Sequence, residues 1–392
     1  MHFCLIYKNN YYCKNISFLC ILLSIISLLL YHFLPFFFFF FSPGVCLLSS
    51  QFSSLAMKKL LQWCSCFYLA LWIGITQLGL MANGKLHASG KWYSNNKKFP
   101  YVSVLVDQSG HGNFSTVQSA IDSVPSNNKN WICIYIKAGI YREKVKIPYD
   151  RPYIILKGEA KRRTQIIWDD HDSTAQSPTF MSLADNIIVK SIRFVNSYNF
   201  LNSNNPRVPA VAAMIAGDKS AFYRCGFAGV QDTLWDDQGR HYFKKCTIQG
   251  AVDFIFGSGQ SIYEGCAIQV IGDGFITAQG RTNPSDANGF VFKRCNVFGR
   301  GSAYLGRPWR GYSRVLFYQS NFTNVIHPEG WNAWDFVHHE NQITFAEYGN
   351  FGPGADTKNR VSWAKKLSHQ TLCKLVSMSF IDTENWIQDQ PL

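Results

Sequence analysis

A short apolar motif recurs along the second half of the sequence at intervals of 20 to 29 residues. Five segments carry it: FYRCGF, YFKKCTI, IYEGCAI, VFKRCNV and LFYQSNF. Their small central residues, 21, 20, 29 and 25 positions apart, are Cys225, Cys246, Cys266, Cys295 and Ser320. The segment IVKSIRF fits the same frame one long interval earlier, with Ser191 at its centre. Periods in this range predict a solenoid, in which each repeat forms one coil stacked on the next.

The coils are predicted to consist of strands. The repeated segments are β-rich and no helical pattern separates them, so each is expected to be a short strand at coil spacing, about 4.8 Å from the next coil. The predicted fold class is therefore all-β, a single-stranded parallel β-helix. One helix is expected over residues 115–125, with Ser115 as N-cap and Pro125 as terminator. It would cap the first coil and cover the open core.

Two acids stand among apolar and aromatic residues in the segment QDTLWDDQGRHYFKKCTIQGAVDFIFG. The interval from Asp232 to Asp253 equals that from Cys225 to Cys246, which is one coil of the predicted solenoid. The two acids are therefore expected to occupy equivalent places on neighbouring coils and to project from the same face. Two carboxylates would then share one site.

The N-terminal part of the chain predicts where in the cell the protein is sent. Met57 opens a segment in which Lys58 and Lys59 precede an apolar stretch to about Ala82, the pattern of a secretory signal peptide. We therefore divide the chain into a non-native leader or upstream extension (1–56), a signal peptide (57–82), a short linker (83–101) and the folded domain with its C-terminal tail (102–392). An alternative for the leader is a membrane anchor formed by residues 16–30 and the six phenylalanines at 36–41.

Charge and cysteine content limit the kinds of binding partner, disulfide and metal site that the chain can have. Lys and Arg outnumber Asp and Glu by 38 to 25, and the segment up to Ala82 holds only four of the lysines, so the domain itself is basic. This balance favours a polyanion: nucleic acid, an anionic membrane or an acidic polysaccharide. Cys225, Cys246 and Cys266 could either form a bridge between coils or remain a buried thiol stack. The sequence shows no CxxC or His/Cys cluster of the kind that binds zinc.

Five ordered motifs resemble the pectin methylesterase family of plant cell walls. They are GIYREKV, GVQDTLWD, AVDFIFG, ITAQGRT and YLGRPWRGYSR, and the resemblance covers about residues 102–363. It implies a right-handed parallel β-helix that hydrolyses the C6 methyl ester of homogalacturonan, releasing methanol and pectate, without a metal or other cofactor. It further implies a secreted monomer of the cell wall that meets methyl-esterified homogalacturonan and a proteinaceous pectinesterase inhibitor, and no nucleic acid. Only the short linker separates the expected cleavage point from the folded domain, which indicates the short type without an inhibitor-like pro-domain.

The resemblance also assigns the chemistry. Asp253 matches the family nucleophile, which attacks the ester carbonyl and forms an acyl-enzyme anhydride. Asp232 matches the general acid that protonates methanol and then activates water. Two like charges placed close together drive their pKa values apart, so a carboxylate pair suits this division. Arg307 matches the arginine that hydrogen-bonds the nucleophile and keeps it anionic, and Gln231 matches a hydrogen-bond donor to the oxyanion.

Three further positions follow from the same motifs. Thr179 and Trp309 match sugar-contacting positions, as does Arg307. Pro209 is a departure, because it stands where the family usually has a second oxyanion-hole glutamine. Proline offers neither a side-chain donor nor a backbone N–H, and losing one such donor typically costs on the order of 100- to 1000-fold in rate.

This departure leaves two alternatives to a fully active esterase. One is a non-catalytic or weakly active wall protein that binds pectin. The other is a depolymerase on the same solenoid, although the sequence shows no additional acid cluster for a Ca²⁺-dependent lyase or an inverting hydrolase. Methanol release, measured against new reducing or unsaturated ends, separates the three.

Overall fold

The computed structural model describes residues 102–160, 163–201 and 206–391. The leader, signal peptide and linker expected over residues 1–101, and the alternative membrane anchor, lie outside these residues. Within the described part of the chain, no helix is long and apolar enough to cross a bilayer.

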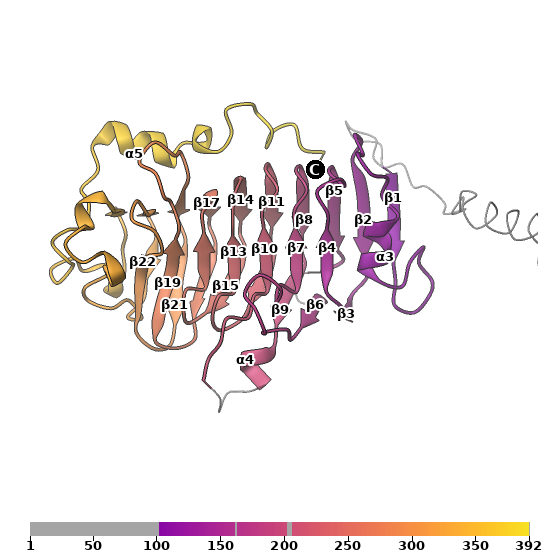
Figure 1. The fold of residues 1–392 in the computed structure, drawn as a ribbon, viewed down its shortest axis with the longest axis horizontal. Coiled ribbons are helices and arrows are strands. Elements are labelled where there is room, and N and C mark those ends of the chain that lie inside the picture. The colour runs from indigo at the N-terminus through magenta and orange to yellow at the C-terminus, as the bar shows by residue number, and fades with distance from the viewer. Residues whose placement is uncertain (1–101, 161–162, 202–205, 392) are drawn as a thin grey trace, which may run out of the picture. The chain divides into compact units, whose positions relative to one another are not determined.

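Three sheets with only parallel pairing wind around one core, as the solenoid prediction requires (Figure 1). The ten-stranded sheet A consists of β1 (Val102–Val106), β2 (Ile132–Ile136), β5 (Ile154–Gly158), β8 (Ile187–Lys190), β11 (Ser220–Tyr223), β14 (Arg240–Lys244), β17 (Gln260–Glu264), β20 (Gly289–Lys293), β23 (Arg314–Tyr318) and β25 (Thr344–Tyr348). The eight-stranded sheet B consists of β3 (Gly139–Arg142), β6 (Thr164–Trp168), β9 (Arg193–Asn196), β12 (Gly226–Ala228), β15 (Thr247–Gly250), β18 (Ala267–Val270), β21 (Asn296–Gly299) and β24 (Asn321–Phe322). The seven-stranded sheet C consists of β4 (Val145–Ile147), β7 (Phe180–Ser182), β10 (Ala213–Ile215), β13 (Leu234–Asp236), β16 (Ile255–Gly257), β19 (Gly274–Gln279) and β22 (Ala303–Pro308).

From β2 to β22 the chain visits sheets A, B and C in turn, so each coil contributes one strand to each sheet. The fold is therefore the predicted right-handed parallel β-helix, a hand that parallel crossovers almost always take. A ladder of stacked rings fills its core, with one ring from each of five successive coils. These rings, 4.4 to 5.0 Å apart between centroids, are Phe222, Phe243, Tyr263, Phe292 and Phe317.

The repeated motif spans two strands, which corrects the expectation that each motif is one strand. In FYRCGF, Phe222 and Tyr223 end β11, Cys225 lies in the turn, and β12 begins at Gly226. The strand breaks because Arg224 takes a left-handed conformation, with φ 53°. At the earliest repeat, the alignment of the motifs differs by one residue from the strand pairing in the structure, because Tyr223 pairs with Lys190. This register places Ser191 at the level of Arg224, with the same left-handed backbone (φ 57°), and not at the level of Cys225.

The cysteine alternatives are settled in favour of thiols. No cysteine of the described residues forms a disulfide, and Cys225, Cys246, Cys266 and Cys295 are buried in successive turns. Each of these four thiols donates to a backbone carbonyl one coil earlier, at sulfur–oxygen distances of 3.3 or 3.4 Å. Burial raises the pKa of Cys246 and Cys266 well above the ordinary value, so these groups stay protonated.

The predicted N-terminal helix is α3 (Val117–Asp122). Its N-cap is Thr116, one residue after the predicted Ser115, because the Thr116 hydroxyl accepts from the Ser119 amide. Val117, Ala120 and Ile121 bury their side chains in the main core. The carboxylate of Glu143 accepts from the amides of Val117 and Gln118 at 2.8 and 2.9 Å, which gives the GIYREKV motif a structural role.

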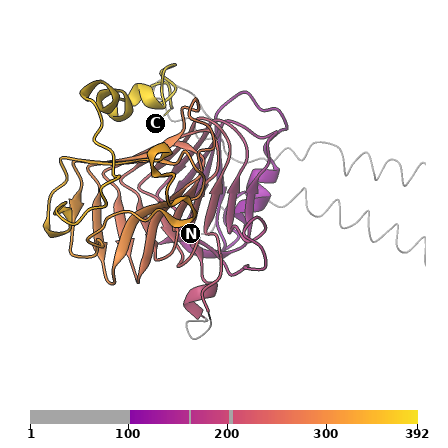
Figure 2. The same cartoon turned by 60° about the vertical axis from the view of Figure 1, so that its left-hand side comes forward.

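The remaining helices are α4 (Tyr198–Leu201), α5 (His369–Val376), η1 (Trp334–Phe336), η2 (Glu340–Gln342), η3 (Pro353–Ala355) and η4 (Met378–Phe380). The C-terminal segment containing α5 runs back over the outer face of sheet A (Figures 1 and 2). There Leu372, Leu375 and Phe380 form a second apolar cluster with outward residues of sheet A such as Tyr242 and Ile262. Sheet A is therefore covered, whereas the predicted acids lie in the turns that lead into sheet C.

Candidate active site

The two predicted acids occupy equivalent positions on neighbouring coils. Leu234 of β13 pairs with Ile255 of β16, and Asp232 and Asp253 each stand two residues before these partners. The ladder already begins at the acids, since the Asp232 amide donates to the Val252 carbonyl at 3.0 Å. The geometric prediction from the coil spacing is therefore confirmed.

Both acids have left-handed backbone conformations, with φ 57° at Asp232 and 47° at Asp253. This turn directs the chain from sheet B into sheet C. Aspartate tolerates the conformation better than most residues, although it costs free energy of about 1 kcal/mol or more. The two acids therefore stand at sharp turns, directly ahead of two paired strands of sheet C.

Arg307 of β22 distinguishes the two acids. Its Nε donates to Oδ1 of Asp253 at 2.9 Å, and its Nη2 donates to Oδ2 at 2.5 Å. The guanidinium is also held between two aromatic rings, 4.2 Å from the centroid of Phe275 and 3.7 Å from that of Trp334. Trp334 has φ 49°, a strained conformation for a bulky residue. This arrangement fixes the guanidinium fork on one carboxylate.

The electrostatics of the pair follow from this asymmetry. Burial, and then the negative charge of Asp253, raise the pKa of Asp232 to about 7, while Arg307 opposes the rise. Burial also raises the pKa of Asp253, but the hydrogen bonds and the charge of Arg307 offset part of that effect. Arg307 therefore favours the ionised form of Asp253, whereas it opposes only part of the rise at Asp232.

Gln231 and Pro209 lie on adjacent coils beside the pair. Gln231 is half-buried and pairs with Val252 on one side, while its carbonyl accepts from the Ala210 amide at 3.3 Å on the other. Pro209 therefore stands one residue before the residue that pairs with Gln231. The segment ahead of Pro209 is fixed because the side chain of Asn199 bonds both the amide and the carbonyl of Val208.

The two predicted sugar contacts differ in position. Trp309 follows β22, is half-buried and meets Phe256 edge-on at 6.0 Å between ring centroids. Thr179, in contrast, is fully buried and donates its hydroxyl to the Val195 carbonyl at 3.0 Å. Its side chain is turned away from the surface, so a sugar contact at Thr179 stays a prediction that this geometry does not favour.

Sequence reasoning missed the aromatic surface beside the acids. Trp235 of β13 stacks on Phe256 of β16 at 5.4 Å, and both form an outer cluster of sheet C with Met214 and Trp309. Aromatic rings offer flat apolar surface to a ligand that has both apolar and polar edges. The missed signal was the coil period, because Trp235 and Phe256 are one coil apart, just as Asp232 and Asp253 are. Among the described residues, no three His, Cys, Asp or Glu side chains are grouped so as to hold a metal ion.

Comparison with known proteins shows the family of the chain. A family model for pectinesterase matches residues 103–384. Two Arabidopsis thaliana relatives, probable pectinesterases 29 and 55, are 63% and 60% identical over 300 residues, covering 74% of this chain and 90% and 91% of theirs. The solved pectin methylesterase from carrot superposes with a TM-score of 0.69 at 32% identity, covering 73% of this chain and 94% of its own. Given the matched domain, the identity to these relatives and the shared β-helix, the chain belongs to the pectinesterase family and is a carboxylic ester hydrolase of pectin.

Proposed function

We propose that this pectinesterase removes methyl esters from homogalacturonan by covalent catalysis at the Asp232–Asp253 pair. The observation that carries the proposal is the asymmetry of the pair, in which Arg307 binds only Asp253. A carboxylate whose lone pairs are held by one guanidinium stays ionised and positioned, as a nucleophile requires. A second carboxyl with a pKa of about 7 is matched to proton transfer near neutral pH.

The reaction proceeds in two steps. Asp253 attacks the ester carbonyl carbon, and the carbonyl oxygen becomes an oxyanion that the Gln231 side chain stabilises. Collapse of this intermediate breaks the bond to methanol, which takes the proton of Asp232, and leaves an anhydride between Asp253 and the sugar carboxyl. Asp232, now a carboxylate, takes a proton from water, and the hydroxide attacks the anhydride. This attack breaks the anhydride bond to Asp253 and restores the original enzyme. The galacturonic acid formed releases its proton to the solvent, so the products are methanol, a galacturonate carboxylate and one proton.

Pro209 makes this proposal specific to the chain. A proline beside Gln231 supplies no second donor to the oxyanion, so we propose that turnover is slower than a second glutamine would allow. The same feature favours one competing function, a wall protein that binds pectin along Trp235, Phe256 and Trp309 with little or no hydrolysis. That alternative predicts pectin binding without methanol release.

The test measures methanol from methyl-esterified pectin, together with new reducing ends and unsaturated ends. Asp253→Asn should abolish methanol release, and Asp232→Asn should leave at most a trace, with both variants folded. Asp172→Asn is the matched control, because it makes the same chemical change at an exposed position. An Asp253→Asn variant that retains most of the wild-type rate refutes the nucleophile assignment, and wild-type protein that yields new chain ends without methanol refutes the esterase.

Localisation follows from the substrate. Because pectin lies in the cell wall, we propose that the chain is secreted by means of the segment that begins at Met57. A chain starting at Met57 should be exported and trimmed near Ala82. N-terminal sequencing of the native protein that finds residues from before Met57 contradicts this proposal.

A further inference from the structure

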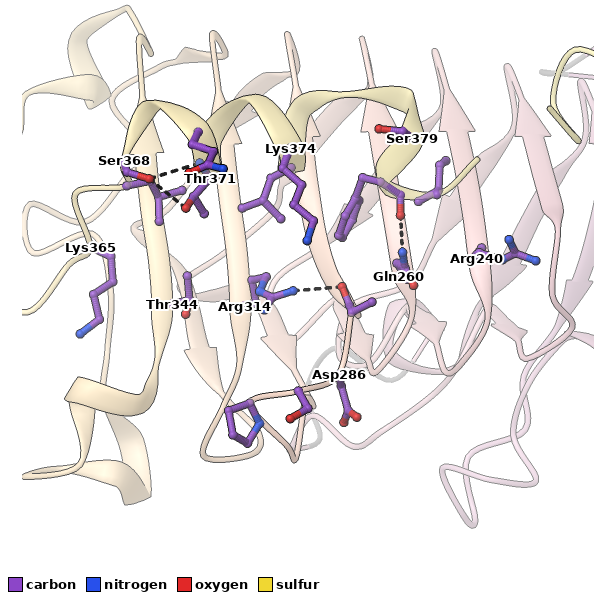
Figure 3. Close-up of a pocket in the computed structure, with 18 of the residues that line it drawn as sticks. Arg240, Gln260, Asp286, Arg314, Thr344, Lys365, Ser368, Thr371, Lys374 and Ser379 are labelled. Carbon is purple, nitrogen blue, oxygen red and sulfur yellow. Dashed lines mark hydrogen bonds between the residues drawn. The ribbon is translucent and has the colours of Figure 1, made fainter. Parts of the chain in front are cut away.

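A cavity of about 1040 Å³ lies beneath α5, away from the aspartate pair (Figure 3). Its floor comes from the first residues of sheet A strands, namely Gln260, Arg314 and Thr344. One wall is the loop of residues 284–287, and the roof is α5. Lys374, in the last turn of this helix, points toward Arg314 in Figure 3. The cavity also extends to Lys365 and Lys366, ahead of α5.

The charges that line this cavity are mostly uncompensated. No carboxylate of the described residues lies within 4.0 Å of the cationic groups of Arg314, Lys365, Lys366 or Lys374. Arg314 instead donates to the carbonyls of Ala287 and Asn288 at 3.0 and 3.2 Å, which leaves its full charge in place. Burial, and then the nearby cation of Arg281, lower the pKa of Arg314 to about 10, and the negative charge of Asp286 only partly opposes this effect.

The two other charged groups in the lining do not cancel this excess. Arg240, at the far end, is paired with Asp218 at 2.6 Å and Glu384 at 3.0 Å, so it adds little net charge. Asp286 contributes one acid, whose side chain points away from α5 in Figure 3. Four free cations against one acid favour an anionic ligand with several charges.

The cavity adjoins a second hollow near the turn that follows β16. A second hollow of about 460 Å³ shares Arg240 and Gln260 with it and includes Ser258 and Asn288. The hydroxyl of Ser258 donates to the Gly280 carbonyl at 2.8 Å, and Gly280 packs directly against the ring of Trp309. Ser258 follows β16, five residues after Asp253, a separation of about 16 Å along an extended strand. Ser258 thus lines the second hollow and also lies near Trp309 and the aspartate pair.

We propose that this cavity binds the carboxylates of de-esterified homogalacturonan, so that product stretches of the polymer hold the enzyme while the aspartate pair acts elsewhere on the chain. The inference rests on the proposed function, because that reaction turns a neutral methyl ester into one carboxylate per sugar. The methyl-esterified polymer has no charge for these cations to bind, whereas its product has a row of them. The site therefore distinguishes product stretches from substrate stretches of one polymer.

The experiment uses fully de-esterified oligogalacturonate as the probe and the Asp253→Asn chain as the background, so that binding is measured without turnover. In this background, Lys366→Gln with Lys374→Gln should weaken binding about tenfold at low salt, equivalent to about 1.4 kcal/mol, and the loss should shrink as salt is added. The matched control is Lys129→Gln with Lys245→Gln, two exposed lysines outside the cavity. Charge reversal in Lys374→Glu should weaken binding further than Lys374→Gln.

Activity separates this proposal from the catalytic one. With Asp253 intact, the Lys366→Gln and Lys374→Gln chain should keep the wild-type kcat on a short methyl-esterified fragment and lose its preference for partly de-esterified pectin through a raised KM. Equal binding losses in the cavity and control variants overturn the site, as does equally tight binding of an unrelated sulfated polyanion. Because the binding assay needs no catalysis, it tests the cavity in the same way if the aspartate assignment fails.

Discussion

The carboxylate of Asp232 should be needed for catalysis and should also lower the stability of the folded protein. Asp232→Asn tests both effects. The substitution keeps the size of the side chain and a residue type that tolerates the left-handed φ of 57°. It removes a carboxylate whose pKa burial and the charge of Asp253 raise from 3.8 to about 7. We expect a variant that is nearly inactive and yet more stable than the wild type at pH 8.

The size of the stability change follows from the difference between the pKa of Asp232 in the native and unfolded states. A native-state pKa above the unfolded value means that the native protein keeps a proton that the unfolded chain has released. The stabilising contribution of Asp232 is therefore complete below about pH 4 and is lost as the pH rises through about 7. The difference between these two pKa values corresponds to at most about 4 kcal/mol. Because Asp232 is only half-buried and water screens it, we expect Asp232→Asn to raise the free energy of unfolding by about 2 kcal/mol at pH 8.

Denaturant unfolding at pH 4 and pH 8 checks this expectation. The increase in the free energy of unfolding should be near zero at pH 4 and should reach its full value at pH 8, where it corresponds to a rise in Tm of about 4 °C. Asp253→Asn is the matched variant, and it should gain less, since hydrogen bonds from Arg307 offset part of the cost of burying that carboxylate. Equal gains in the two variants, or a gain at pH 8 no larger than at pH 4, would refute the assignment of Asp232 as the destabilised, proton-holding member.

Four further expectations follow from the site and its supports. The alkaline limb of kcat/KM should fall near pH 7, where Asp232 loses its proton, and should vanish in the residual activity of Asp232→Asn. Pro209→Gln should raise kcat by about tenfold or more with little change in KM, and an unchanged kcat in the folded variant means that another group serves the oxyanion. Arg307→Lys should lower kcat/KM roughly 10- to 100-fold, because lysine provides neither the two-pronged hydrogen bond nor the stacking, and an unchanged profile would contradict the positioning role. His241→Phe, which removes the buried partner 2.5 Å from Asp236, should cost about 3 kcal/mol in denaturant unfolding without changing the pH profile of any remaining activity.

The sequence predicted what depends on the coil period and missed what depends on the turns between strands of one coil. The coil spacing placed Asp232 and Asp253 on equivalent positions, because register in a stacked solenoid is set by coil length. The same spacing could not show that FYRCGF contains a strand break, since a left-handed arginine such as Arg224 has no clear sequence signature. The assignment of chemistry to Arg307 came from family resemblance.

The contacts missed from the sequence involve distant segments. Trp334 reaches Arg307 from η1, outside the repeating coils, and neither its spacing nor its type predicts a ring 3.7 Å from a guanidinium. The cavity beneath α5 arises because the C-terminal segment folds back over sheet A through Leu372 and Leu375. Such a return depends on an apolar outer face of the sheet, which appears only when the strands are in register.

A solenoid repeats its backbone, so two identical residues on adjacent coils become chemically different only through what lies above and below them. Asp232 has Asp253 as its neighbour on the next coil, whereas the position after Asp253 in the same ladder is Phe275, because Ile255 pairs with Thr277. Tyr304 follows Phe275, and Arg307, three residues further along β22, returns past the Phe275 ring to reach Asp253. Two coil spacings are about 10 Å, a distance that suits the long arginine side chain with an aromatic ring beneath its guanidinium. The order of acid, acid and aromatic along one ladder thus places the cation on the second carboxyl and leaves the first without one, which is the asymmetry that the proposed covalent ester hydrolysis requires.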